Sequence, residues 1–125
     1  MPQFVTCLNC MDGRVQKPVI EWLTKTYLAE HIDMITEAGM DGFLVNMNRL
    51  PAELRNKIDI SLQKHGSGQI FIVSHYDCGG HAVDEITHRK HTLIAVDKIK
   101  MLYPECKVYG LWISEAWEVE QIAEK

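Results

Sequence analysis

The sequence predicts an α/β fold with a small, mainly parallel sheet of four strands and helices on both faces. Short apolar segments alternate along the chain with segments of helical periodicity, which is typical of parallel sheets. The 125 residues are 46% hydrophobic and 24% charged, enough for a domain with its own core. No linker, repeat or low-complexity segment is visible, so we expect a single domain over residues 1–125.

The elements follow from local signals. Pro18 suits the first turn of a helix, and Pro51 opens a helix in which Leu54, Ile58 and Leu62 recur every fourth residue. Residues 70–73 form an uninterrupted apolar run, as in buried parallel strands. In chain order we expect a strand over 3–9, a helix over 18–27, a strand over 31–36, a helix from 51 that ends before Gly66, a strand over 69–74, a helix over 91–102 that Pro104 stops, a strand over 107–113 and a terminal helix from Ser114 onward.

Charge and composition exclude several classes of partner. The net charge is −4 and no run of Lys or Arg is present, which argues against nucleic acid or an anionic membrane. The sequence contains neither a transmembrane-length apolar stretch nor the plan of a signal peptide. Four cysteines in such a chain favour reduced thiols that serve metal or redox chemistry, and hence a cytoplasmic location.

The segment His75-Tyr-Asp-Cys78-Gly-Gly follows the most strongly predicted strand. An imidazole and a thiolate at the exit of a buried strand lie where open α/β sheets bind ligands, and both are zinc ligands. In isolation, His75 would be an ordinary loop histidine and Cys78 a small buried residue. A third ligand from elsewhere in the chain would favour the metal site.

Cys10 is the expected third ligand, and Cys7 is assigned to the core. In a strand these two residues would lie roughly 10 Å apart on opposite faces, whereas two sulfurs on one zinc lie within about 4 Å of each other. In two alternatives Cys7 has a functional role. One is a four-ligand structural zinc site, and the other is a redox protein with a Cys7–Cys10 dithiol.

Asp12 and Arg14 follow Cys10 closely. A carboxylate two residues from a ligand can reach the metal or a water bound to it. A guanidinium two residues later can pair with that carboxylate and keep it ionised. Alone, Asp-Gly-Arg is an ordinary turn, but beside the other ligands it indicates a catalytic site.

These motifs resemble those of the β-class carbonic anhydrases. The family carries C-x-D-[S/A]-R at the end of its first strand and H-x-x-C-G at the end of a later one. Here the matching segments begin at Cys10 and His75. Weaker similarity joins residues 36–39 to the family's R-N-A-G and residues 108–110 to its V-x-G strand. The resemblance covers about residues 4–113, in the same order.

The resemblance implies a strand order of 2-1-3-4, which brings the ends of strands 1 and 3 together. It also implies Zn²⁺ bound by Cys10, His75 and Cys78, with Asp12 and Arg14 as the catalytic dyad. A homodimer or higher homo-oligomer is implied as well. Two positions depart from the family pattern: Gly13 replaces Ser or Ala, and Glu37 stands where Asn is usual.

Two functions follow as hypotheses. As an enzyme, the chain would hydrate CO₂ reversibly to bicarbonate by a zinc-bound hydroxide, and COS or CS₂ are alternative small linear substrates. Two thiolates cancel most of the zinc charge, so its water should be less acidic than on a three-histidine site. As a non-catalytic protein, the chain would bind zinc with Asp12 permanently in the fourth position.

Further residues receive no assigned role. His81, His88 and His91 could shuttle protons or bind metal, but we expect them to face solvent. Asp77 could orient His75 or be an exposed turn residue. The remaining residues without a role are Trp22, Trp112 and Trp117, expected in the core or an interface, and Cys106.

Overall fold

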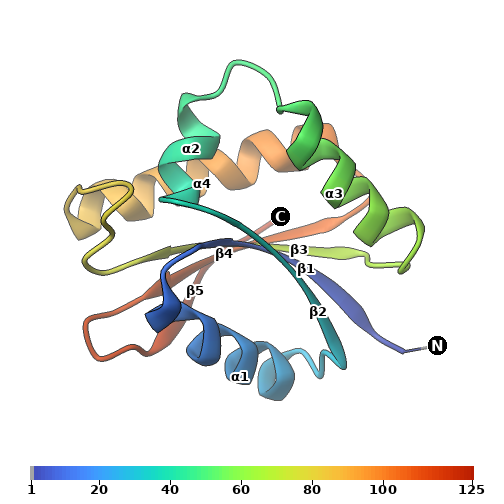
Figure 1. The fold of residues 1–125 in the computed structure, drawn as a ribbon, viewed down its shortest axis with the longest axis horizontal. Helices are drawn as coiled ribbons and strands as arrows, with labels where there is room; N and C mark the ends of the chain where they lie inside the picture. The colour runs from blue at the N-terminus through green and yellow to red at the C-terminus, as the bar shows by residue number, and fades with distance from the viewer. Residues whose placement is uncertain (1) are drawn as a thin grey trace.

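The computed structural model describes residues 2–125 and contains a five-stranded sheet covered by helices (Figure 1). The strands lie in the order β2-β1-β3-β4-β5; the first four in sequence are parallel, and β5 runs antiparallel to β4. The predicted order 2-1-3-4 is therefore confirmed, with one strand added at an edge. The strand bounds are β1 (Phe4–Cys10), β2 (His31–Glu37), β3 (Gln69–His75), β4 (Lys107–Ile113) and β5 (Val119–Glu124).

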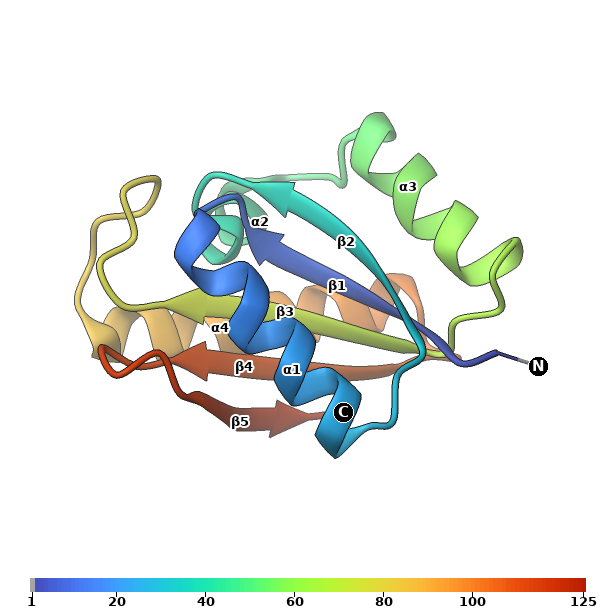
Figure 2. The ribbon, with the colours of Figure 1, turned by 60° about the horizontal axis from the view of Figure 1, so that its bottom comes forward.

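Helices lie on both faces of the sheet, as predicted. Figures 1 and 2 show α1 alone on one face and the other three α-helices on the opposite face. Within residues 2–125, no helix combines the length and the apolar character that a membrane span requires. The helix bounds are η1 (Gly13–Val15, a 3₁₀ turn), α1 (Gln16–Thr26), α2 (Met40–Asn46), α3 (Ala52–Gln63) and α4 (Glu85–Leu102).

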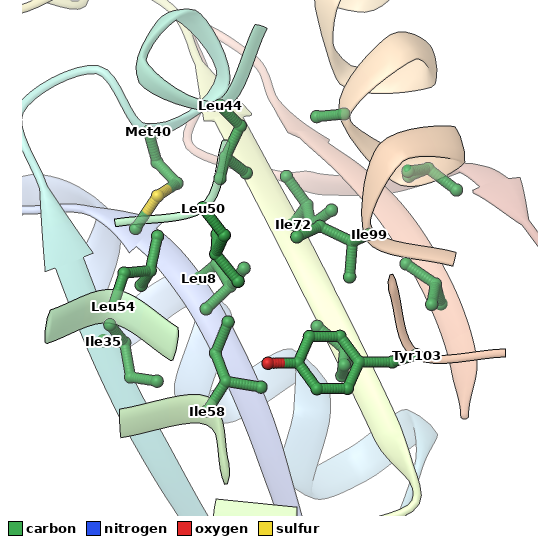
Figure 3. Close-up of a cluster of buried hydrophobic side chains, with 14 of the residues drawn as sticks. Leu8, Ile35, Met40, Leu44, Leu50, Leu54, Ile58, Ile72, Ile99 and Tyr103 are labelled. Carbon is green, nitrogen blue, oxygen red and sulfur yellow. The ribbon is translucent and has the colours of Figure 1, made fainter. Parts of the chain in front are cut away.

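Each face of the sheet carries its own hydrophobic core, because successive strand residues point to opposite faces. Figure 3 shows the larger cluster, in which Leu8 and Ile72 of the sheet meet Leu44 and Ile99 of the helices. Cys7 belongs to the cluster beneath α1 and is fully buried. Its assignment to the core is confirmed.

The terminal helix predicted from Ser114 onward is wrong, because the chain turns back and forms β5. The Trp117 amide donates to the Ser114 carbonyl at 2.9 Å, and the Ser114 amide donates to the Glu118 carbonyl at 3.0 Å. Trp117 takes a left-handed conformation with φ of 60°. Glycine or asparagine usually marks such a turn, so the sequence carried no clear signal for it.

Two helices also differ from the prediction. α4 begins at Glu85, well before His91, because the Asp84 side chain accepts a hydrogen bond from the Thr87 amide at 2.9 Å and caps the helix. The short helix α2 was not predicted. It follows Gly39, which has a φ of 62°.

Gly110 in β4 lies at a close contact between α4 and the sheet. A Cβ atom at this position would lie 2.8 Å from the Thr92 methyl group of α4, and 3.2 Å from side-chain atoms of Ala123 and Val96. The missing side chain therefore allows α4 to approach β4.

We expect Gly110→Ala to lower the free energy of unfolding by about 1–3 kcal/mol, the usual cost of overpacking a core. Urea unfolding followed by circular dichroism measures the effect. Gly68→Ala is the control, because an added Cβ there meets nothing within 4 Å. Equal stability of the two variants would contradict this account of the α4–β4 contact.

Candidate metal centre

Cys10, His75 and Cys78 come together at the carboxyl ends of β1 and β3. One donor atom from each lies within 4.8 Å of the other two, and all three residues are buried. The two sulfurs are 4.0 Å apart, close to the separation expected for two thiolates on one tetrahedral zinc. The three predicted ligands thus form one compact set of sulfur and nitrogen donors.

The His75 ring presents one nitrogen to this set. Its Nδ1 lies 2.7 Å from the Tyr76 carbonyl, which can only accept, so Nδ1 carries the proton. Nε2 then has a free lone pair, yet it is buried and has no hydrogen-bond partner within residues 2–125. A buried lone pair without a partner is unfavourable, and a metal ion among these donors would satisfy it.

The low pKa of one of the two thiols also favours a bound cation. A hydrogen bond from the Cys78 thiol, with support from the amides of Gly39 and Asp12, lowers the pKa of Cys10 to about 4 despite its burial. The same contact with Cys10, reinforced by burial, raises the pKa of Cys78. Cys10 is therefore a thiolate at neutral pH, the form that binds metals.

Two glycines allow the surrounding loops to close on the site. Gly39 follows β2 with a left-handed φ of 62°, and its amide donates to Cys10 Sγ at 3.4 Å. A Cβ on Gly80 would lie 2.5 Å from the Ala38 carbonyl carbon, so only glycine lets the two loops touch. These contacts place the loop after β2 directly against the donors.

Asp12 and Arg14 form a bidentate pair beside the donors. Arg14 Nη2 lies 2.7 Å from Asp12 Oδ2, and Nε lies 3.1 and 3.2 Å from the two carboxylate oxygens. The hydrogen bonds from Arg14 hold the pKa of Asp12 at about 2. Asp12 does not belong to the cluster of donors within 4.8 Å that the structure forms among residues 2–125.

The turn that carries Asp12 is closed by side chains. Asp12 Oδ1 accepts from the Arg14 amide at 2.9 Å, and the Gln16 amide group donates to the carbonyls of Cys10 and Asp12 at 2.8 and 2.9 Å. Sequence reasoning missed Gln16, although a glutamine near a helix start is a plausible partner for loop carbonyls. These bonds fix the turn in spite of Gly13.

Arg14 has two more partners, both from distant segments. Its Nη2 donates to the Asp77 carbonyl at 3.0 Å and its Nη1 to the Asp77 carboxylate at 3.2 Å. The guanidinium also lies over the Trp117 ring, 4.8 Å from the centroid. Asp77 therefore holds Arg14 and not His75, and Trp117 contacts the site although it was expected only in the core or an interface.

His81, His88 and His91 were expected to face solvent, and this expectation is wrong for His88. His88 is only 1% exposed, and His81 and His91 are half-buried. Glu37 lies opposite Cys10 in the β1–β2 register. Cys106 is buried in the larger hydrophobic cluster and, among residues 2–125, is not part of the donor set.

Comparisons with known proteins agree with this fold. Residues 1–123 match the model of a family described as "Putative carbonic anhydrase", and no curated protein matches the chain. A carbonic anhydrase from Streptococcus mutans has a TM-score of 0.67 at 17% identity, with 98% of this chain and 83% of that one covered.

Two other solved structures are similar to a comparable degree. A tetrameric β-carbonic anhydrase from Sordaria macrospora has a TM-score of 0.67 at 9% identity, with 99% of this chain and 82% of that one covered. A carbon disulfide hydrolase in its apo form has a TM-score of 0.59 at 12% identity, with coverages of 96% and 79%. At these identities the structures establish the fold, and the match over residues 1–123 establishes that this chain belongs to the carbonic anhydrase family.

Proposed function

We propose that this chain is a zinc enzyme that hydrates CO₂ reversibly to bicarbonate. Cys10, His75 and Cys78 would hold the metal, Asp12 would act on the attacking water, and Arg14 would position Asp12. The observation that carries the proposal is the pairing of Asp12 with Arg14. This pairing turns the carboxylate toward the guanidinium. Cys10, His75 and Cys78 would then hold the metal, and a fourth position would be left for water.

The donor set fits zinc and not a hard cation. Two thiols and an imidazole suit zinc, whereas magnesium and calcium prefer oxygen ligands. Zinc held by three protein ligands lowers the pKa of a bound water and so supplies a nucleophile at neutral pH. The remaining steps depend on side chains of the chain itself.

Asp12 is suited to accept a hydrogen bond from the attacking water. With a pKa of about 2 it is ionised throughout the neutral range, so it is always an acceptor. Arg14 orients it through two nitrogens, and Asp77 and Trp117 hold Arg14 in turn. A carboxylate fixed in this way can orient a water lone pair toward the carbon of CO₂.

Two other activities remain alternatives. CS₂ or COS would suit the same nucleophile, and a carbon disulfide hydrolase shares the fold. In the non-catalytic alternative Asp12 would occupy the fourth metal position. That arrangement would require Asp12 to leave Arg14, at the cost of a charge-assisted bidentate pair.

We expect Cys78→Ser to lose most of its zinc, because a hydroxyl is a far weaker zinc ligand than a thiolate. Metal analysis of purified, zinc-loaded protein measures this. Cys7→Ser is the matched control, since Cys7 lies in the core and burial raises its pKa. Equal loss of zinc in the two variants would indicate a four-ligand structural site.

We expect Asp12→Asn and Arg14→Ala to lower the rate of CO₂ hydration while both variants keep their zinc. A charge-assisted hydrogen bond at a reacting centre contributes about 1.5–3 kcal/mol, or roughly one to two decades in rate. Stopped-flow hydration on zinc-loaded protein, with COS and CS₂ assayed in parallel, provides the measurement.

If the wild type is active and both variants hydrate CO₂ at the wild-type rate, Asp12 and Arg14 have no part in the mechanism. Zinc-loaded wild type that turns over none of the three substrates between pH 6 and 9 would instead favour the non-catalytic alternative. Asp12 stays ionised over that whole range, so its titration could not account for such an outcome.

We also propose that the chain forms a homodimer or a higher homo-oligomer through an edge of the sheet. β2 and β5 are the two edge strands, and edge strands offer unpaired backbone groups. The related Sordaria macrospora protein is tetrameric. We expect light scattering at micromolar concentration to give at least twice the 14.3 kDa of one chain; a monomer would overturn this proposal.

A further inference from the structure

A second set of metal-binding side chains lies between α2, the loop after β3 and the start of α4. Asp41 comes from α2, His81 from the loop and His88 from α4. One donor atom from each lies within 4.8 Å of the other two. None of these three residues belongs to the Cys10 site, and nothing proposed above uses them.

The Asp41–His88 pair is almost completely buried. Asp41 Oδ2 lies 2.7 Å from His88 Nδ1, and both side chains are 1% exposed. This contact is the only hydrogen bond or ion pair that the Asp41 side chain makes within residues 2–125. A buried carboxylate is costly unless it is hydrogen-bonded and its charge is compensated, so a cation beside this pair would stabilise it.

His88 also presents an unsatisfied atom. Its Nδ1 faces a carboxylate and so carries a proton, and in the neutral ring Nε2 then has a lone pair. That nitrogen is buried and has no partner within the described part of the chain. Histidines that bind metals usually donate their other N–H to a carboxylate or carbonyl, and His75 shows the same arrangement at the Cys10 site.

The His81 side chain packs tightly against two glycines, where any larger residue would clash with it. A Cβ on Gly42 would lie 2.5 Å from Cγ and Nδ1 of His81, and a Cβ on Gly39 would lie 2.7 Å from its Cβ. The ring is edge-on to His88, with centroids 5.3 Å apart. His81 Nε2 lies 2.8 Å from His91 Nδ1, which adds a third imidazole at the margin.

We propose that this cluster binds one divalent transition-metal ion through ring nitrogens of His81 and His88, with the Asp41 carboxylate supplying the compensating negative charge. Imidazole and carboxylate donors suit zinc and its neighbours in the series, and magnesium and calcium would prefer an all-oxygen site. The ion would satisfy His88 Nε2 and neutralise Asp41. It would also tie α2 to α4 beside the loop that carries Cys78.

The competing account is a hydrogen-bonded network in which a proton on one of the imidazoles provides the charge. Such a network would hold α2 against α4 without binding metal. Both accounts predict that Asp41 and His88 matter for stability, so stability alone does not separate them. Metal stoichiometry and the spectrum of bound cobalt do.

The experiment loads metal-free protein with excess Zn²⁺ or Co²⁺, removes unbound metal by gel filtration and measures metal per chain. We expect about two equivalents in the wild type and about one in His81→Asn and Asp41→Asn. Asn at position 41 keeps a neutral acceptor for the His88 N–H. Cys78→Ser should also retain about one equivalent, and Cys78→Ser combined with His81→Asn should retain none.

Cobalt spectra assign each equivalent to its site. The Cys10 site should give near-ultraviolet thiolate-to-cobalt absorption, whereas the histidine cluster should add only visible d–d bands. His81→Asn should lose the added visible bands and keep the thiolate absorption. The matched control is His65→Asn, because His65 forms a comparable pair with Asp33 (2.6 Å) away from both clusters and should keep both equivalents.

A wild type that saturates at a single equivalent with thiolate absorption would overturn the proposal. Retention of both equivalents by His81→Asn would do the same. The His81 side chain is half-buried in a loop, so its replacement tests the site even if Asp41→Asn fails to fold. In Cys78→Ser, loss of the metal ion at the Cys10 site tests the proposed enzyme site. The metal that this variant retains then measures binding at the histidine cluster alone.

Discussion

The parallel pairing of β1 with β3 determines where every proposed ligand of the Cys10 site lies. These strands pair from Thr6–Ile70 to Leu8–Ile72. Cys10 then follows two residues beyond Leu8, and His75 three residues beyond Ile72. Because both strands end at the same edge of the sheet, donors far apart in sequence meet. A slip of one residue in this register would turn one set of side chains to the other face.

The orientation of Asp12 depends on contacts well beyond its own turn. Arg14 reaches the carbonyl and carboxylate of Asp77 after β3, and it lies over Trp117 in the turn before β5. Together with Asp12 in its own turn, these two distant segments fix one guanidinium. The antiparallel hairpin at the edge of the sheet, which contributes no metal ligand, therefore supports the geometry of the proposed dyad.

The sequence was sufficient for strands β1 to β4 and for the three donors because both depend on strong local signals, whereas the strand order followed from the resemblance to the β-class carbonic anhydrases. Apolar runs mark the strands, and motif spacing marks the donors at their ends. The hairpin before β5 was missed because its left-handed position is occupied by Trp117 and not by glycine or asparagine. The burial of His88 was missed because it depends on Asp41, 47 residues away, which no local pattern connects to it.

The loop after β2 links the two clusters of donors, although the sequence offered only a weak motif for it. Gly39 donates its amide to the Cys10 sulfur and opens α2. Two residues later Asp41 contacts His88. The His81 side chain packs with its Cβ atom against Gly39 and with its ring against Gly42. From the loop after β3, Gly80 packs against Ala38 and Gly39. Gly80 lies two residues after Cys78 and directly before His81. One short segment, the start of α2, therefore contacts both clusters: the Gly39 amide reaches the Cys10 sulfur and Asp41 reaches His88.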